Sequence, residues 1–507
     1  MNTFKKKSLY LAVAGASALG AGSASAVTLN ADGLGSVLLY PYFTVRESSA
    51  GAAYNSLLSV VNSTASAKAV KVRFLEGKNS REVLDFNLYL SAKDVWVAAV
   101  IPTAAGAGIV TPDNSCTDGI VSHDENNPTP FVNYAYTGEF DDPANDDLDR
   151  TREGYVEIIE MGAMYGYGAK WATHGSSGVP AHCDYLREFR NGGLVEAGYW
   201  VTSLTGGLFG TMTLINVTSG LDFGYDATAL AAFANFTYGS GIFANPGSIF
   251  PNLNSGDPVS LVVQNDLLFG QAAAYVTVWD EAQFWQPVDA VSAVLTHDHI
   301  YNEFVLDAAT KSGTDWVVTM PTKWAYYANN PTTTQLKVNR LFQRNFTSTG
   351  ACDDISFAKY DREEKVVKVS SSFSPPPPTK TDSICWEANV ITFNSSNVLA
   401  SKNQLNATTT FEHGWADMGF PQVSTAIPAT SLVHRLGGGS TTRINLLSGG
   451  TDTWTSATYW GLPVIGFAAV TYNNGNLNGA LSNYGGNFDH KSTRDVQVRF
   501  TPITPLP

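Results

Sequence analysis

Residues 56–101 decide the fold, and they read SLLSVVNSTASAKAVKVRFLEGKNSREVLDFNLYLSAKDVWVAAVI. Apolar runs or alternations at 56–62, 69–74, 84–90 and 95–101 are separated by polar turn residues. Short apolar segments that recur about every ten residues between turns are typical of a β-sandwich. We therefore expect strands here, around a core of Leu58, Val60, Val70, Val72, Phe74, Leu84, Phe86 and Leu88.

The rest of the chain has the composition of a β-rich protein. Charged residues make up 15% and aromatic residues 12% of its 507 residues, and glycine occurs 45 times. This profile favours strands joined by turns over helices, which prefer Ala, Leu, Glu, Lys and Arg. We expect a mostly β fold with β-sandwich-like domains, long polar loops and few short helices. A short helix is expected at the Ala-rich stretch 226–235, and a loop at the Asn- and Gly-rich stretch 473–486.

The length of the chain predicts more than one domain. The predicted division is a signal peptide at 1–26, an N-terminal β-sandwich-like domain at 27–205, a second β-rich domain at 206–345, and a C-terminal β-rich region at 346–507 with a proline-rich loop at 375–378.

The first 26 residues have the pattern of a cleavable secretory signal. Lys5, Lys6 and Lys7 precede an uncharged stretch at 8–20, and an A-x-A cleavage site follows at 24–26. The uncharged stretch is shorter than the roughly 20 residues that span a bilayer. We therefore expect an exported mature chain that begins at Val27 and contains no transmembrane helix.

Four cysteines remain in the mature chain, and an even number in an exported protein predicts disulfides. Three pairings of Cys116, Cys183, Cys352 and Cys385 can be drawn. The pairs Cys116–Cys183 and Cys352–Cys385 are favoured because each closes a loop within one region of the chain.

The charge balance argues against nucleic acid as a partner. The formal net charge is −14, and it becomes more negative once the three lysines of the signal leave. Proteins that bind nucleic acid need clustered Lys and Arg to neutralise phosphates, and the chain has no basic block.

Two groups of residues are candidate metal ligands. His297 and His299 alternate as in a strand, so that both side chains would share a face, with Glu303 as a third candidate ligand. An acidic run on a polar stretch predicts a calcium site, since calcium prefers several oxygen ligands. This run consists of Asp141, Asp142, Asp146, Asp147 and Asp149.

A cluster of aromatic residues is a candidate binding surface. Trp316, Trp324, Tyr326 and Tyr327 lie close in sequence, and exposed rings of this kind stack on sugars or anchor a protein partner. Core filling is the alternative interpretation of the same residues. No nucleophile-elbow or phosphate-loop frame occurs, so we expect a protein without catalytic activity.

Four segments carry a resemblance: Asp32-Gly33-Leu34-Gly35 leading into Tyr40-Pro41-Tyr42; Arg73-Phe74-Leu75-Glu76-Gly77; Thr314-Asp315-Trp316-Val317-Val318-Thr319 with Pro321-Thr322-Lys323; and Phe373-Ser374-Pro375-Pro376-Pro377. Together they resemble an uncharacterised family of proteobacterial secreted proteins described only as hypothetical or cell-surface. The resemblance spans most of the mature chain. It implies export and a surface location, and it brings no activity and no site residue.

These observations favour an exported structural or adhesive protein of the bacterial cell surface or extracellular space, with self-association or a surface glycan or protein as its partner. One alternative is an outer-membrane β-barrel, although roughly 10-residue strands that alternate apolar with polar residues are not evident. A secreted glycan-binding protein or hydrolase is another. The periplasm is the alternative location.

Overall fold

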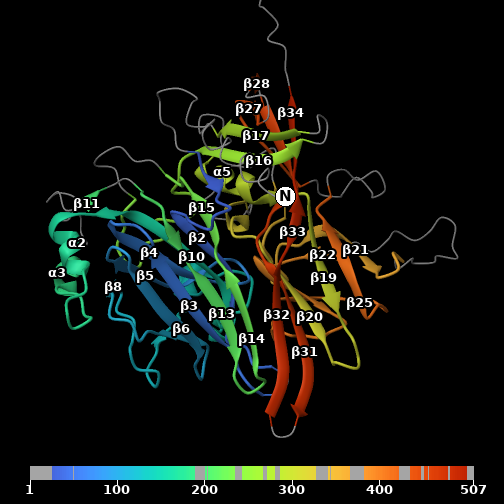
Figure 1. The fold of residues 1–507 in the computed structure, drawn as a ribbon, viewed down its shortest axis with the longest axis horizontal. Helices are drawn as coiled ribbons and strands as arrows, with labels where there is room; N and C mark the ends of the chain where they lie inside the picture. The colour runs from blue at the N-terminus through green and yellow to red at the C-terminus, as the bar shows by residue number, and fades with distance from the viewer. Residues whose placement is uncertain are drawn as a thin grey trace, which may run out of the picture.

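The computed structural model describes residues 26–48, 51–188, 200–201, 204–234, 242–266, 271–279, 286–326, 341–342, 344–365, 382–421, 434–446, 450–454, 456–477 and 480–499. Strands account for 50% of the residues and helical residues for 10%, so the expected mostly β class is confirmed (Figure 1). Residues 1–25 of the predicted signal peptide (1–26), the proline run at 375–378 and Tyr327 lie outside the described residues.

The N-terminal half is a sandwich of two sheets, which we call sheets I and II. Sheet I has the order β1 (Thr28–Leu29), β15 (Thr228–Ala231), β2 (Val37–Thr44), β10 (Glu153–Met164), β4 (Ala67–Glu76), β5 (Glu82–Leu90), β8 (Cys116–Asp118), and β11 (Trp200–Val201) pairs with β10. Sheet II has the order β14 (Leu221–Asp226), β13 (Thr211–Asn216), β3 (Asn55–Asn62), β6 (Val95–Pro102), β7 (Ala107–Val110), β9 (Thr129–Pro130), and β12 (Leu208–Phe209) pairs with β3.

The core of the sandwich is the one that the sequence predicts. Alternate residues of β3, β4 and β5 point between the sheets, because successive side chains of a strand face opposite ways. Seven of the expected core residues are buried and the eighth, Leu84, is partly buried; the seven are Leu58, Val60, Val70, Val72, Phe74, Phe86 and Leu88.

The C-terminal half contributes two further sheets, III and IV. Sheet III has the order β24 (Gln404–Ala407), β23 (Ala388–Phe393), β20 (Gly313–Thr319), β31 (Phe467–Leu477), β32 (Ala480–Asp489). Sheet IV has the order β22 (Asp382–Ile384), β21 (Asp353–Asp361), β25 (His413–Gly419), β19 (His299–Val305), β33 (Lys491–Thr493).

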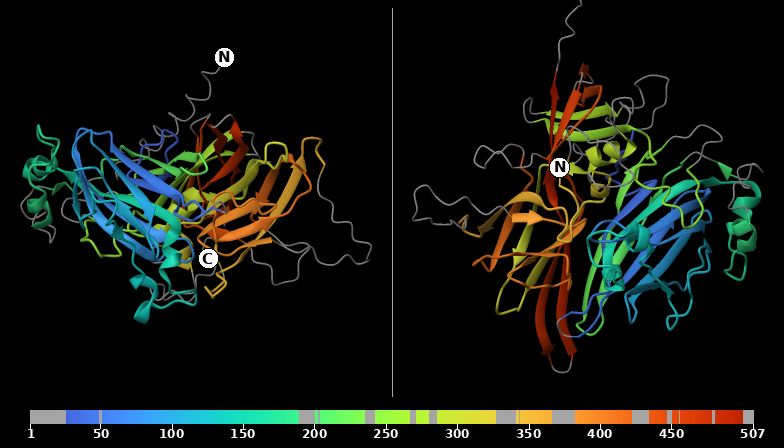
Figure 2. Two further views of the ribbon diagram at one scale, coloured as in Figure 1. Left: turned by 90° about the horizontal axis from the view of Figure 1, so that it is seen from below. Right: turned by 180° about the vertical axis from the view of Figure 1, so that it is seen from behind.

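The central strand of sheet III, β20, is buried on both faces. Trp316 and Val318 of β20 belong to the core that sheet III shares with sheet IV, whereas Val317 belongs to the core of the N-terminal sandwich. Every residue of β20 is buried, which is why this strand is apolar at successive positions. Sheet III therefore stands between the sandwich and sheet IV, and sheet IV lies on the side of the molecule away from the sandwich (Figures 1 and 2).

The remaining elements lie at one end of the molecule or in connections. The small sheets are β16 (Val259–Asp266), β17 (Gln271–Val278), β27 (Thr441–Asn445) and β28 (Thr451–Trp454); β26 (Arg435–Gly437), β29 (Ser456–Trp460) and β34 (Asp495–Arg499); and β18 (Thr296–His297) with β30 (Leu462–Pro463). The helical segments are α2 (Gly166–Ala172), α3 (Cys183–Glu188), α5 (Pro287–Leu295), η1 (Tyr134–Tyr136), η2 (Gly138–Phe140), η3 (Leu148–Arg152) and η6 (Lys323–Tyr326). None of the helices in the described ranges is long and apolar enough to cross a bilayer.

Helix α5 begins where its sequence places the start signals. Pro287 occupies the first turn, where its missing N–H costs nothing. The Asp289 carboxylate accepts a hydrogen bond from the backbone N–H of Gln286 at 2.7 Å, which satisfies a group that the helix leaves free. Residues 288–295 are all buried, so α5 is a core helix.

Sheet pairing crosses both expected domain boundaries. Strands β12 to β15, which follow residue 205, pair with strands of the N-terminal sheets. Strand β17 pairs with β27, and β20 pairs with β23, across residue 345. Strands distant in sequence thus complete shared sheets, which local composition does not indicate.

Two local predictions are wrong. The Ala-rich stretch 226–235 contains a strand, β15, because its backbone pairs with β2 in the register Thr228 to Leu39. The stretch 473–486 continues the long β31–β32 hairpin, in which Tyr472 lies opposite Tyr484. In both cases pairing with a neighbouring strand outweighs the intrinsic preference of the residues.

The disulfides join Cys116 to Cys183 and Cys352 to Cys385, as the favoured pairing predicts. The first ties α3 to β8 at the edge of sheet I. The second ties the start of β21 to the end of β22 in sheet IV. Each half of the molecule therefore carries one covalent cross-link, and such cross-links fit an oxidising compartment.

Hydrogen bonds join the two halves beside the shared core. The Thr319 hydroxyl donates to the carbonyl of Pro41 at 2.6 Å, and the Tyr54 hydroxyl donates to the carbonyl of Val398 at 2.8 Å. The buried Glu153 carboxylate accepts from the Ser401 hydroxyl at 2.6 Å. The halves are thus held together by both polar and apolar contacts.

Candidate binding surface

The predicted aromatic surface is mostly core. Trp316 is 0% exposed and packs against Phe357 and Phe393 with ring centroids 5.5 Å away. Tyr326 is 3% exposed, and its hydroxyl donates to Asp289 at 2.8 Å. Trp324 is partly buried against the same core. The expectation that this cluster is exposed is wrong, because β20 and η6 face the interior.

Two residues of the acidic run, Asp142 and Asp149, form ion pairs with basic side chains. Asp142 pairs with the buried Arg150 at 2.7 Å. Asp149 pairs with Arg46 at 2.6 Å and with Lys402 at 2.8 Å. Burial raises the pKa of Asp149, but hydrogen bonds from these two cations outweigh it and lower the pKa to about 2.

The calcium prediction finds no support in this loop. Asp147 accepts from the Asn145 amide at 2.7 Å, whereas desolvation and then the like charge of the nearby Asp141 raise the pKa of Asp146. Within the described ranges, no three or more His, Cys, Asp or Glu side chains converge to hold a metal ion. Arg150, which pairs with Asp142, lies in the same stretch as the acidic run, so the sequence already contained a cation for this carboxylate.

His297 and His299 do not share a site. His297 belongs to β18, which pairs with β30, whereas His299 begins β19 in sheet IV. His297 faces Arg494, and burial together with this cation lowers the pKa of His297 well below its usual value. His299 instead pairs with Asp417. The chain changes sheets between the two histidines, so the strand alternation that predicts a common face fails.

Sheet IV carries exposed aromatic side chains on its outer face. In β19, Ile300 and Phe304 are buried in the core, and the alternate residues His299, Tyr301 and Glu303 point outward. In the strand pairing, Trp415 of β25 lies opposite Glu303 on one side and Tyr360 of β21 on the other. Three neighbouring strands thus place their aromatic residues on one face.

Four of these rings form a row of two stacked pairs, His299 with Tyr301 and Trp415 with Tyr360, and we call it the aromatic row. Trp415 and Tyr360 are stacked with centroids 4.4 Å apart and an interplanar angle of 13°. Trp415 and Tyr301 are 6.3 Å apart, and Tyr301 stacks on His299 at 5.9 Å. Trp415 is 41% exposed, which is unusual for so large an apolar side chain.

Polar groups accompany the row. His299 Nδ1 lies 2.6 Å from Asp417 Oδ1, which fixes the imidazole ring. Partial burial and the neighbouring Asp417 raise the pKa of Tyr301, so its hydroxyl stays protonated and can donate. Lys491 is exposed on β33 directly opposite Tyr301. The row therefore presents ring edges, hydroxyls, a carboxylate and an ammonium group side by side.

The sequence contains only a weak signal for this row. His299-Ile300-Tyr301 and Trp415-Ala416-Asp417 each alternate an aromatic residue with an apolar one. Each segment alone resembles an ordinary half-buried strand. Pairing of β19, β25 and β21 is needed to bring the rings together, and pairing between distant segments cannot be read from local pattern.

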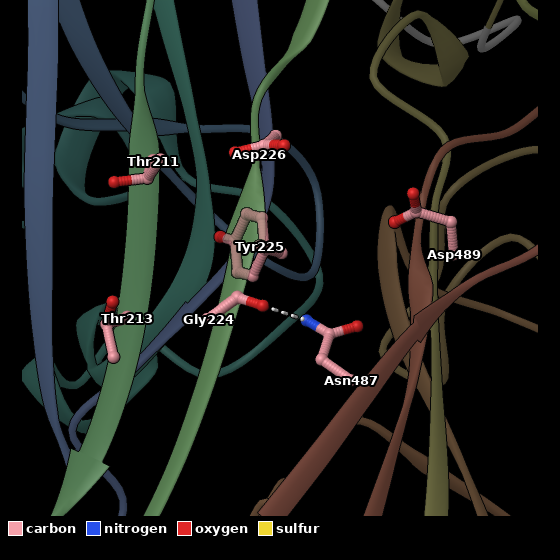
Figure 3. A pocket seen from close by; sticks show the side chains of 7 residues that line it. All are labelled: Thr211, Thr213, Gly224, Tyr225, Asp226, Asn487 and Asp489. Atoms are coloured by element: carbon pink, nitrogen blue, oxygen red, sulfur yellow. Dashed lines mark hydrogen bonds between the residues drawn. The ribbon is translucent and has the colours of Figure 1, made fainter.

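A polar hollow of about 350 Å³ lies where the two halves meet at their edge strands (Figure 3). It is lined by Thr211, Thr213, Gly224, Tyr225, Asp226, Asn487 and Asp489. The Asn487 amide donates to the carbonyl of Gly224 at 2.9 Å, so a side chain bridges β32 to β14. Its lining contains no basic side chain and offers mainly hydrogen-bond acceptors.

No family model, curated protein or solved structure matches this chain.

Proposed function

We propose that this chain is an exported, non-catalytic adhesive protein of the cell surface or extracellular space, and that it attaches to a polysaccharide through the aromatic row. The observation that carries the proposal is the exposure of Trp415 at 41% within a row of four neighbouring rings. The two disulfides support export, because such bonds persist in oxidising compartments.

The row supports binding because it is held in place before a ligand arrives. Trp415 lies between Tyr360 and Tyr301, and His299 is fixed by Asp417. Rings that are already ordered lose little conformational entropy on binding. Such a preformed surface suits adhesion, in which many contacts that are each weak gain strength through repetition.

The neighbouring polar groups favour a polysaccharide. A sugar ring combines apolar C–H groups with hydroxyls around its rim, so it needs aromatic surface and hydrogen-bonding groups together. Tyr301, Glu303 and Lys491 place a donor, an acceptor and a cation beside the rings. The exposed edges of Trp415 and the outer side of Tyr360 supply the aromatic surface.

The test compares two exposed aromatic residues. Purified residues 27–507 are mixed with chitin, cellulose and peptidoglycan particles, and the bound fraction is measured. We expect binding to at least one particle, and Trp415→Ala should weaken it roughly 30-fold, the loss typical of a central aromatic contact.

Tyr484→Ala is the matched control, because Tyr484 is 59% exposed on β32, outside the row. It should bind as the unaltered protein does. Absence of binding to all three particles, or equal binding by Trp415→Ala, would contradict the proposal.

A further inference from the structure

Three lysines in the described part of the chain are completely buried, and each of them forms an ion pair with a carboxylate. The pairs are Lys68 with Glu160, Lys71 with Asp85, and Lys323 with Asp353. A buried lysine is uncommon, because removing an ammonium group from water costs free energy that its partner must offset. The surroundings of the three carboxylates therefore indicate which pairs are stable as ions.

Two of the carboxylates receive hydrogen bonds from the backbone. Glu160 accepts from the N–H groups of Thr205 and Gly206, each at 2.9 Å. Asp85 accepts from the N–H of Gly247 with both of its oxygens, at 2.9 and 2.8 Å. Hydrogen bonds to a carboxylate favour its charged form. Lys68–Glu160 and Lys71–Asp85 are therefore ordinary buried ion pairs.

Asp353 lacks this support. Its side chain is 1% exposed, and neither of its oxygens accepts a hydrogen bond from the described residues. Lys323 Nζ lies 2.8 Å from Asp353 Oδ2, but the contact does not have the alignment of a hydrogen bond. The amine thus stands beside the carboxyl group without pointing along a lone pair of its oxygens, and it is within reach of the carboxyl carbon.

The two groups meet in an apolar environment. Lys323 Nζ lies 5.4 Å from the ring centroid of Phe342 and donates to the carbonyl of Ala351 at 2.6 Å. Burial disfavours charge, so an ammonium–carboxylate pair without further hydrogen bonds can neutralise itself by passing one proton from nitrogen to oxygen. A desolvated neutral amine is a nucleophile, and a neutral carboxylic acid is an electrophile.

The second oxygen of Asp353 faces a buried histidine. His434 is 0% exposed, and its Nδ1 lies 4.0 Å from Asp353 Oδ1. This nitrogen carries a proton, since it also lies 2.8 Å from the carbonyl oxygen of Leu341, which can only accept. The N–H of His434 is therefore placed to stabilise negative charge that develops on Oδ1 when the carboxyl carbon is attacked.

We propose that Lys323 and Asp353 are joined by an amide bond in the folded protein. The lone pair of the neutral Nζ attacks Cγ of the protonated carboxyl group, and the N–C bond forms. The hydroxyl of the carboxyl group then leaves with the electrons of the broken C–O bond, takes up the proton that nitrogen releases, and departs as water. The reaction needs no oxidant and no second substrate.

The fold supplies what this reaction requires. Folding holds the amine against the carboxyl group, which removes the entropic cost of bringing them together. Exclusion of water from the core protects the amide from hydrolysis. The bond ties η6, which follows β20 of sheet III, to the start of β21 in sheet IV, next to the Cys352–Cys385 disulfide. It does not depend on what the aromatic row binds.

The experiment is mass spectrometry of residues 27–507, which are folded, then reduced and denatured. We expect the chain to be lighter than its sequence by the mass of one water. Tryptic digestion should yield one branched peptide in which Lys323 is joined to Asp353, and trypsin should not cleave after Lys323 because its amine is acylated.

Two matched substitutions assign the loss of water. Lys323→Arg keeps the positive charge but removes the nucleophile, so this variant should have the full mass of its sequence. Lys68→Arg makes the same change in a pair whose carboxylate receives backbone hydrogen bonds, and it should still lose one water. If Lys323→Arg fails to fold, Lys323→Met combined with Asp353→Leu replaces the pair by apolar residues, which buried pairs commonly tolerate.

The proposal is overturned if the unaltered chain has the full mass of its sequence, because Lys323–Asp353 is then an ordinary buried ion pair. A branched peptide that joins other residues would also overturn it, as would a loss of water that persists when Lys323 is replaced.

Discussion

The outer faces of sheets II and IV are both exposed sides of antiparallel sheets, and they offer opposite chemistry. The outer face of sheet II presents Leu57, Val95 and Val97 without charge, whereas the aromatic row stands beside Asp417 and Lys491. Aliphatic burial is non-directional and depends on area, whereas rings and hydrogen-bonding groups discriminate by geometry. The difference teaches that two solvent-facing sides of one β-rich chain can differ in chemistry according to the sheet that carries them.

Removing the disulfides should give the largest effect. Replacing both cysteines of the Cys116–Cys183 pair by serine should lower the free energy of unfolding by about 4 kcal/mol, because 67 residues separate them. The Cys352–Cys385 pair, separated by 33 residues, should cost slightly less. Urea unfolding measures both losses.

The two disulfide variants also test where the particle-binding surface lies. Loss of Cys352–Cys385 loosens β22 beside β21, the strand that carries Tyr360, so particle binding should weaken. The variant of the Cys116–Cys183 pair should retain particle binding by the folded fraction. Equal loss of particle binding in both variants would contradict the placement of the binding surface on sheet IV.

Lowering the pH should reduce the stabilising contribution of a histidine in the C-terminal half and increase that of a glutamate in the N-terminal half. Burial lowers the pKa of His490, beneath sheet IV, from 6.5 to about 4, so its stabilising contribution is present above pH 6.5 and is lost as the pH falls toward 4. In sheet I, burial raises the pKa of Glu157 from 4.5 to about 6, against the pull of Arg73. The contribution of Glu157 is present below pH 4.5 and is lost as the pH rises through 6.

Urea unfolding at pH 7 and pH 4.5 measures these contributions. His490→Gln keeps a donor toward the carbonyl of Val317 but cannot titrate in this range. On acidification the unaltered protein should lose about 1–3 kcal/mol relative to His490→Gln. Relative to Glu157→Gln it should gain a smaller amount. Parallel pH profiles of all three proteins would contradict both assignments.

Substitution of Tyr360, at one end of the aromatic row, should give the smallest effect, a modest loss of particle binding. Tyr360→Ala removes the ring that stacks on Trp415 at 4.4 Å, and it should weaken particle binding roughly fivefold, or about 1 kcal/mol. Tyr360→Phe keeps the ring and should bind nearly as the unaltered protein does. Equal loss in both variants would assign the contact to the hydroxyl instead of the ring.

Local pattern predicts these strands of the sandwich well because each one carries its own apolar run or alternation between polar turn residues. Residues 56–101 supply β3, β4, β5 and β6, and the expected core is buried apart from partly buried Leu84. The Ala-rich β15 is not predicted, since its strand conformation comes from pairing with β2 across nearly the whole sandwich. Propensity thus fails where a distant partner decides the conformation.

The candidate site is harder to predict for the same reason. Trp316 and Trp415 look alike in sequence, but one strand lies between two sheets and the other at the surface. The exposed Trp415 gains its ring neighbours only through the order β21-β25-β19. The disulfides could be predicted because loop closure within one region is a local property, whereas a surface composed of three strands is a property of the topology.

The sharing of sheet III between two cores has a consequence for the order of folding after export. The strands of the N-terminal sandwich are complete once residue 231 has emerged, but Val317, Val390 and Phe467, which cover part of its core, follow much later. A sandwich that forms first therefore has an open apolar side until β31 arrives. Such an interval exposes a chain to aggregation, so this protein should depend on chaperones of the compartment in which it folds.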